Sequence, residues 1–200
     1  IINTLILFTF YKIMKNITIL ISGSGTNLQR IIDCIENGEI RNARIIQVIA
    51  DRECYGLERA QKHQIPNELI KRGKDFAENL EQAVPENTDL IVLAGFLSIL
   101  KPEFCEKWEG KIINIHPALL PKFGGKGMWG HHVHNAVIEA GEKESGASVH
   151  YVTSGIDEGE VILQGKFEID KTDTAEKVAE KVHLIEYDIF PKAIDMVLNK

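Results

Sequence analysis

Cysteine is scarce in this sequence, which has three such residues among 200. Cys34, Cys54 and Cys105 are odd in number and widely spaced. They match neither a disulfide framework nor the paired C-x-x-C ligands of a zinc site. Unpaired thiols are typical of a reducing compartment, so the cysteine pattern predicts a cytoplasmic protein.

The sequence also lacks a long apolar run and an excess of basic residues. No stretch reaches the roughly 18 consecutive apolar residues that a membrane-spanning helix needs. The 23 Lys and Arg residues are outnumbered by 29 Asp and Glu, for a net charge of −6. Because phosphate neutralisation dominates nucleic-acid affinity, we expect no DNA or RNA partner. With 44% apolar and 26% charged residues, the composition predicts one soluble globular domain.

Residues 1–13 are apolar, but they lack the basic flank and the small-residue cleavage site of a signal peptide. Met14 stands directly before the first strand pattern. We therefore interpret residues 1–13 as an upstream extension outside the fold, and residues 14–200 as a single domain.

From Asn16 onward, short apolar runs alternate with segments of helical periodicity, an order typical of β-α units. The expected strands are 17–21, 45–50, 90–94, 112–115, 148–153 and 161–169. The expected helices are 28–35, 57–63, 75–84, one from Pro102, 134–140, and one capped by Thr174 that Pro191 should bend or end. The early strands are apolar on both faces, whereas the last two alternate and are close enough to pair antiparallel. The sequence predicts a single Rossmann-like α/β domain with a mostly parallel central sheet flanked by helices, and antiparallel strands near the C-terminus.

A glycine-containing turn, Ser22 to Asn27, lies between the first strand and the first helix. Free backbone amides at a helix N-terminus can bind a phosphate. Leu28 stands where a dinucleotide fingerprint needs its third glycine, and no Walker lysine follows, so one phosphate monoester is favoured over a pyrophosphate. A simple tight turn is the alternative. Asp51, after the second strand, could bind the ribose of a nicotinamide cofactor or merely cap a loop.

Two polar residues, Asn114 and His116, end the strand at 112–115 and share one face of it because they are two positions apart. An amide donor beside an imidazole can stabilise an oxyanion and carry a proton. Local hydrogen bonding at a strand end is the alternative. Asp157 lies in an acidic turn, 155–159, which taken alone indicates a solvated hairpin.

The glycine-rich segment 123–132 leads into His131, His132 and His134. This cluster lacks the HExxH spacing, and no cysteine or carboxylate ligand is near it. We therefore expect a flexible loop running into a helix, and no metal.

Several blocks then occur in one order: ILISGSGTNLQ (19–29), LAGFLSIL (93–100), INIHPALLPKF (113–123), SVHYV (148–152) and IDEGEVILQ (156–164). Together they resemble the phosphoribosylglycinamide formyltransferase family, and the similarity extends from Met14 to the C-terminus. The resemblance implies an enzyme of de novo purine biosynthesis. Such an enzyme transfers a formyl group from the co-substrate 10-formyltetrahydrofolate to the amine of glycinamide ribonucleotide. It would act on small molecules alone, as a monomer or homodimer.

The resemblance also implies roles for individual residues. The catalytic residues are Asn114, His116 and Asp157, with Ser148 and His150 behind them. Substrate would be bound by Gly25, Thr26, Asn27 and Glu186, the last of these on the ribose. The folate pterin would lie against Leu97, Ser98, Ile99, Leu100 and Asn114. Either Arg72 or Lys74 would be the basic residue facing the folate. The loop at 123–134 is longer and richer in glycine and histidine than the family pattern, so its role is left open.

Three alternatives remain. A 10-formyltetrahydrofolate deformylase would bring an additional N-terminal regulatory domain, and a methionyl-tRNA formyltransferase would bring a basic RNA face and a further C-terminal domain. A nicotinamide-dependent nucleotide-binding protein would use Gly23, Gly25 and Asp51 and leave Asn114, His116 and Asp157 idle. We expect all three to fit less well.

Overall fold

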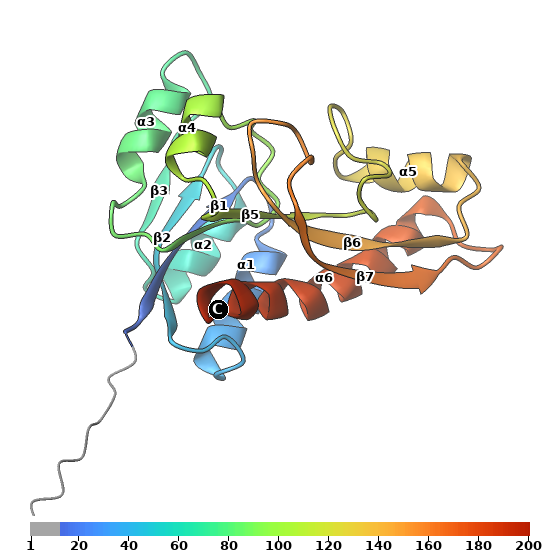
Figure 1. The fold of residues 1–200 in the computed structure, drawn as a ribbon, viewed down its shortest axis with the longest axis horizontal. Coiled ribbons are helices and arrows are strands. Elements are labelled where there is room, and N and C mark those ends of the chain that lie inside the picture. Colours follow the sequence, from blue (N-terminus) through green and yellow to red (C-terminus); the bar gives the residue numbers. More distant parts are fainter. Residues whose placement is uncertain (1–12) are drawn as a thin grey trace, which may run out of the picture.

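A computed structural model describes residues 13–200, so residues 1–12 of the expected upstream extension lie outside the described part. One sheet runs through these residues in the order β3-β2-β1-β4-β5-β6-β7, with helices on both faces (Figure 1). The strands are β1 (Lys15–Ile21), β2 (Ala43–Ala50), β3 (Asn67–Leu69), β4 (Leu90–Leu93), β5 (Ile112–His116), β6 (Glu144–Tyr151) and β7 (Val161–Glu168). The helices are α1 (Thr26–Glu36), α2 (Tyr55–Lys62), α3 (Phe76–Ala83), α4 (Pro102–Lys107), α5 (His131–Glu139) and α6 (Ala175–Leu198).

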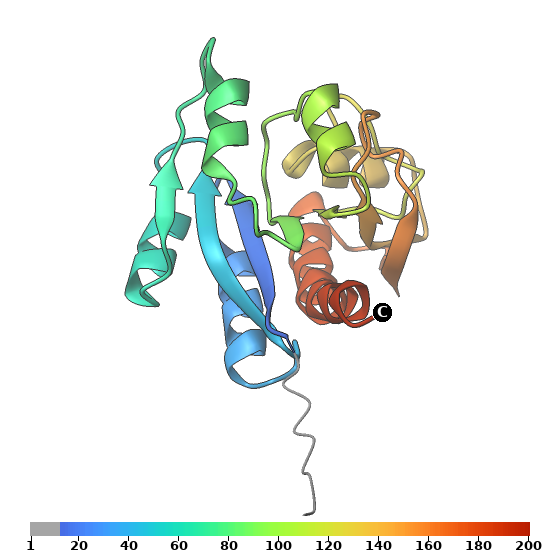
Figure 2. The same cartoon turned by 60° about the vertical axis from the view of Figure 1, so that its left-hand side comes forward.

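Two apolar cores form, one on each face of the sheet. Helices α1, α2 and α6 cover one face, where Leu28 of α1 and Ile189 of α6 belong to the same cluster. Helices α3 and α4 cover the other face with Leu80 and Phe104. Figure 2 shows this arrangement from a second direction, with the long α6 lying apart from α3 and α4. Strands with cover on both faces need mostly apolar residues, which explains the apolar run of β4 and the mainly apolar part of β1 at 17–21.

The first five strands pair in parallel, and the four of them that the sequence predicts, β1, β2, β4 and β5, confirm the expected parallel sheet. Consequently the carboxyl ends of β1, β4 and β5 meet at one edge of the sheet. Ligands of open α/β sheets bind in the crevice outside these ends. The turn after Ile21, the segment after Leu93 and the end of β5 at His116 all lie at this edge.

The predicted antiparallel strands are confirmed at the other end of the sheet. Strand β6 pairs antiparallel with both β5 and β7. The register places Asn114 opposite His150 and His116 opposite Ser148. This register brings polar side chains of β6 beside those of β5.

The structure corrects several expected boundaries. Strand β3 was not predicted, because three polar-flanked residues at a sheet edge carry no apolar run. Helix α5 begins at His131 rather than His134, and β6 begins at Glu144 rather than Ser148. Thr174 caps α6 as predicted, accepting a hydrogen bond from the Lys177 amide.

Of the two effects predicted for Pro191, bending or ending the last helix, the second is wrong, since α6 continues to Leu198. A proline removes the amide that would bond the carbonyl four residues earlier, here that of Tyr187. The Arg30 Nε atom donates to this Tyr187 carbonyl over 3.1 Å. A side chain from α1 therefore replaces the missing bond, and the helix continues.

Within residues 13–200, no helix combines the length and apolar character that a membrane crossing requires. Cys34, Cys54 and Cys105 carry free thiols.

Candidate active site

A cleft of about 720 Å³ opens at the carboxyl edge of the sheet. Its walls are segments 23–27, 93–100, 114–117, 125–131 and 152–157, together with side chains of α5 and α6. Every expected catalytic and substrate-binding residue lines this cleft, as do the expected pterin-binding residues 97–100, whereas neither Arg72 nor Lys74 does. Residues spread over most of the chain therefore meet around one cavity.

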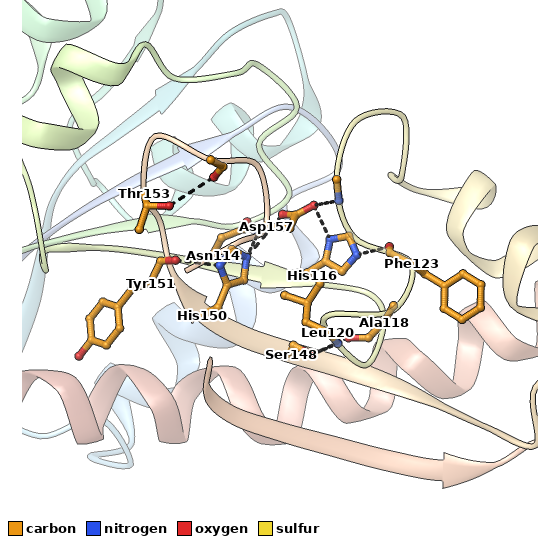
Figure 3. A network of polar contacts seen from close by, with 12 residues as sticks. Asn114, His116, Ala118, Leu120, Phe123, Ser148, His150, Tyr151, Thr153 and Asp157 are labelled. Carbon is orange, nitrogen blue, oxygen red and sulfur yellow. Dashed lines mark hydrogen bonds and ion pairs between the residues drawn. The ribbon is translucent and has the colours of Figure 1, made fainter. Parts of the chain in front are cut away.

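The imidazole of His116 is held at both nitrogen atoms (Figure 3). Its Nε2 donates to the Phe123 carbonyl over 2.8 Å, because a carbonyl can only accept. Its Nδ1 faces Asp157 Oδ2 at 3.5 Å. Burial lowers the pKa of His116 below its usual value, although the Asp157 carboxylate and the Phe123 carbonyl act in the opposite direction. A neutral ring beside a carboxylate that can favour its protonation is suited to carrying a proton.

The carboxyl group of Asp157 is mostly buried, with 11% of the side-chain surface exposed. Burial acts to raise the pKa of Asp157, but contacts with His150, with His116 and with the Gly125 amide outweigh it, so the pKa lies below its usual value. The Gly125 amide donates to Oδ2 over 2.9 Å. Asp157 has a φ of +58°, a left-handed conformation that aspartate tolerates better than most residues. The carboxylate is thus charged and aimed into the cleft.

Close approach of the loop to this carboxylate requires a glycine at position 124. A Cβ atom built there would lie 2.6 Å from Leu120 Cδ2 and 3.2 Å from Asp157 Cβ. The glycine-rich loop, whose role was open from the sequence, therefore supplies backbone groups to both His116 and Asp157.

Asn114 is oriented by its cross-strand neighbour. His150 Nδ1 donates to the Tyr151 carbonyl over 2.8 Å, and Asn114 Nδ2 lies 3.1 Å from His150 Nε2, to which it can donate. The second hydrogen of that amide stays free to donate. His150 Nε2 also lies 3.5 Å from Asp157 Oδ1, so this histidine touches both Asn114 and Asp157.

Ser148 holds the chain that follows His116. Its hydroxyl donates to the Ala118 carbonyl over 2.6 Å and accepts from the Leu120 amide at 3.0 Å. Gln164 Nε2 reaches the same hydroxyl at 2.8 Å. Ser148 has no exposed surface, so it supports the turn after β5 from behind rather than facing the cleft.

The turn before α1 has the geometry of an anion site. Gly25 caps the helix with φ +70° and no side-chain cap is present, which leaves the first amides of α1 available. A Cβ atom at Gly25 would lie 2.7 Å from the Cα of Gly56. Arg59 Nε donates to the Ser24 carbonyl over 2.8 Å, which places a positive charge beside the turn.

Asn27 and Glu186 join α1 to α6 inside the cleft. Asn27 Nδ2 donates to Glu186 Oε2 over 3.1 Å. His183 Nδ1 donates to the same oxygen over 2.7 Å, and this bond raises the pKa of His183. The second carboxylate oxygen, Oε1, accepts no hydrogen bond from residues 13–200 and can bind a ligand.

The segment expected to receive the pterin is fixed by hydrogen bonds at its base. The Leu97 amide donates to Ser22 Oγ over 2.8 Å. Ser98 Oγ donates to Asp51 Oδ2 over 2.7 Å. Leu97 and Ile99 remain exposed, at 42% and 69% of their surface, and so present apolar surface to a flat ring.

The structure corrects the ribose-binding interpretation of Asp51. The residue is 1% exposed, and its oxygens are taken by Arg52 at 3.0 Å, by Arg72 Nε at 2.7 Å and by Ser98. Burial acts to raise the pKa of Asp51, but these bonds hold it below the usual value. Asp51 therefore has a structural role inside the protein.

The two basic candidates for folate contact, Arg72 and Lys74, are both exposed. Only Arg72 has a hydrogen bond to the expected pterin-binding segment, with its Nε atom 2.8 Å from Ser98 Oγ.

Sequence reasoning gave no site role to three histidines that line the cleft, His131, His134 and His183. For His183 a signal was present, because residues three apart share a helix face and His183 precedes Glu186 by one turn. His131 and His134 were considered only as metal ligands. Among residues 13–200, no group of three or more His, Cys, Asp or Glu residues has an arrangement that could hold a metal ion.

Comparison with known proteins agrees with this geometry. The profile of the family described as formyl transferase matches residues 15–194. A phosphoribosylglycinamide formyltransferase of Haemophilus influenzae is 43% identical over 189 residues, which cover 90% of this chain and 86% of that protein. A trifunctional purine biosynthetic protein adenosine-3 of Chironomus tentans is 38% identical over 92% of this chain, which corresponds to 14% of that protein. The solved phosphoribosylglycinamide formyltransferase of Coxiella burnetii superposes with a TM-score of 0.83 at 40% identity, covering 91% of this chain and 86% of that one.

Proposed function

The chain belongs to the formyl transferase family, and from this membership we propose that it transfers a formyl group from 10-formyltetrahydrofolate to the amine of glycinamide ribonucleotide in purine biosynthesis. The observation that carries the proposal is the meeting of Asn114, His116 and Asp157 in one cleft. This set lies between a turn suited to a phosphate and an apolar segment suited to a pterin.

The two substrates would bind to different segments of the cleft wall. The phosphate binds the amides of Gly25, Thr26 and Asn27, and the ribose hydroxyls bind the free oxygen of Glu186. The pterin lies against residues 97–100. In this placement the amine and the formyl group meet beside His116. This residue ends β5 and lines the same cleft as both binding segments.

Formyl transfer passes through a tetrahedral intermediate. The amine nitrogen attacks the formyl carbon, and the carbonyl electron pair moves to the oxygen, where the free hydrogen of the Asn114 amide donates. Asp157 accepts a proton from the attacking nitrogen, directly or through water, and the adjacent Nδ1 of His116 can take it on. The resulting imidazolium stabilises the oxyanion. The carbon–nitrogen bond to the folate then breaks, and the imidazolium returns its proton to the departing nitrogen.

This role for His116 has a structural requirement. Its Nε2 hydrogen is used by the Phe123 carbonyl, so the loop carbonyl must give way for Nε2 to reach an oxyanion. The chemistry needs a donor, a proton carrier and an acceptor, and the proposal therefore includes no metal. Dialysis against a chelator should leave turnover unchanged.

The decisive experiment supplies 10-formyltetrahydrofolate to the purified protein, with and without glycinamide ribonucleotide, and follows the loss of the formyl group from the folate. We expect turnover to depend on the ribonucleotide and to yield formylated product. Equal turnover without the amine would instead favour a deformylase. The nicotinamide alternative loses its ribose-binding acid, since Asp51 is occupied by Arg52, Arg72 and Ser98.

The folded unit is proposed to be residues 14–200. Its support is that β1 begins at Lys15 and that the family match begins at residue 15. A chain starting at Met14 should keep the melting temperature and the activity of the full sequence. A cytoplasmic location and a monomeric or homodimeric state complete the proposal, and size-exclusion chromatography with light scattering would decide the latter.

A further inference from the structure

Two enclosed polar atoms in the cleft have no hydrogen-bond partner within residues 13–200. They are Asn27 Oδ1 and His134 Nδ1, and both residues line the cleft. Asn27 is 8% exposed and His134 is 6% exposed. Buried polar groups are almost always paired, so an unpaired one inside a binding cleft indicates a place where a ligand completes the bonding.

The position of His134 follows from the packing of its helix. Val133 and Val137 of α5 are buried against Ala118, which follows β5. Helix α5 also contacts α6, and the beginning of α6 lies near α5 in Figure 1. The titratable groups that act on His134 are Glu186, His131, His183 and His116. His134 thus lines the same cleft as the proposed ribose-binding carboxylate and the proposed catalytic imidazole.

The unpaired nitrogen of His134 needs a partner in either protonation pattern of the ring. Burial lowers the pKa of His134, and a neutral imidazole has one N–H group and one lone pair. The enclosed Nδ1 therefore requires either an acceptor or a donor, and residues 13–200 supply neither. A hydroxyl or carboxamide group of a ligand can act in both ways.

We infer that His134 is a substrate-binding residue whose Nδ1 forms a hydrogen bond with the sugar or the carboxamide link of the ribonucleotide. The inference rests on the proposed function. In glycinamide ribonucleotide, the sugar and its carboxamide link connect the phosphate end to the reacting amine. In the proposed placement this part of the ligand runs from Glu186 to His116, and His134 lines the same cleft. The unpaired Asn27 oxygen can accept a hydroxyl or amide hydrogen from the same ligand. Since His134 does not touch the reacting atoms, it contributes to binding rather than to the chemical step.

Three substitutions at this position test the inference. His134→Phe keeps the ring size and removes both nitrogens; His134→Gln keeps a polar group near the position of Nε2; His134→Asn keeps one near the position of Nδ1. The matched control is His132→Gln, because His132 is exposed on the same helix and does not line the cleft. The measurements are the Kd for glycinamide ribonucleotide by calorimetry, the KM for each substrate, kcat and the melting temperature.

We expect His134→Phe and His134→Gln to weaken ribonucleotide binding about tenfold, the effect of one lost hydrogen bond. The KM for 10-formyltetrahydrofolate should stay within about twofold, and His134→Asn should retain most of the affinity. The His132→Gln control should match the wild type.

Several results would overturn the inference. These are unchanged ribonucleotide binding in His134→Phe, an equal loss of affinity for both substrates together with a lower melting temperature, or rescue by Gln instead of Asn. A wild-type protein that does not bind glycinamide ribonucleotide would overturn the proposed function as well. If the wild type binds and formylates it while His134→Phe is unaffected, only the His134 assignment fails.

Discussion

The Nδ1 atom of His116 lies 3.5 Å from Oδ2 of Asp157, although helix α5 and strand β6 separate the two residues in the chain. The antiparallel pairing of β5 with β6 returns the chain to the end of β5, and the turn after β6 then carries Asp157 over His116. The Gly125 amide holds the same carboxylate oxygen over 2.9 Å. This contact joins three segments of the chain at the proposed reaction centre.

Removing either member of this pair should reduce kcat without preventing folding. Loss of one group that stabilises a developing charge typically costs about 10² to 10³ in rate, so we expect reductions of this order for His116→Ala and Asp157→Asn. Steady-state kinetics at saturating substrates, with melting temperatures as a folding check, would measure the effect. Near-normal turnover in either variant would contradict the assigned roles.

The stability of the protein should depend on pH through His116. Its pKa is lowered in the folded state by burial, whereas in the unfolded chain it titrates near the usual histidine value of about 6.5. Between these two values the unfolded state binds more protons, so this contribution to stability is complete above about pH 6.5 and decreases as the pH falls. His183 acts in the opposite sense because Glu186 raises its pKa, but it is half exposed and counts for less.

Melting temperatures measured from pH 5 to pH 8 would check this dependence. The wild type should lose stability on the acid side, and His116→Gln should show a shallower decrease, because glutamine does not titrate. Parallel pH profiles for the two proteins would contradict the expectation.

Ser148→Ala should destabilise the fold by about 1 to 3 kcal/mol, because it leaves the buried Leu120 amide without its acceptor. The hydroxyl also bonds to the Ala118 carbonyl and to Gln164, so the turn after His116 should loosen and kcat should fall as well. Chemical denaturation gives the free energy of unfolding. Thr172→Ala, at an exposed position, is the control and should be neutral.

Gly25→Ala should damage both stability and substrate binding. The new Cβ would lie 2.7 Å from the Gly56 Cα at a φ of +70°, which only glycine adopts without cost. We expect a lower melting temperature and a raised KM for the ribonucleotide, with a smaller change in the KM for the folate. Gly73→Ala is the matched control, because a Cβ there meets nothing within 4 Å.

Most of the helices and strands could be predicted because their apolar spacing is a local property of the sequence. Strand β1 and helix α1 follow the predicted pattern within a few residues. The failures come from contacts between distant segments. Pro191 does not end α6, because Arg30 donates a hydrogen bond to the Tyr187 carbonyl. The sequence around Pro191 gives no indication that Arg30 is near.

The residues of the candidate site also fall into those that local spacing predicts and those that depend on distant segments. Asn114 and His116 could be placed on one face from their spacing alone, because a strand repeats every two residues. Asp157 had only a resemblance to connect it to them, since its turn is an ordinary acidic hairpin by composition. For Asp51 local reasoning left two roles open, and its enclosure by Arg52, Arg72 and Ser98 removed the ribose-binding one.

Residue order alone was sufficient for the α/β class, the glycine turn before α1 and the pairing of an amide with an imidazole at a strand end. These features depend on periodicity and on neighbours within one element. The Asp157 carboxylate beside His116, the backbone bonds from the glycine-rich loop and the unpaired nitrogen of His134 became visible only once the chain was folded. Their chemistry depends on burial and on partners from remote segments, and those are set by the packing of the whole sheet and its helices.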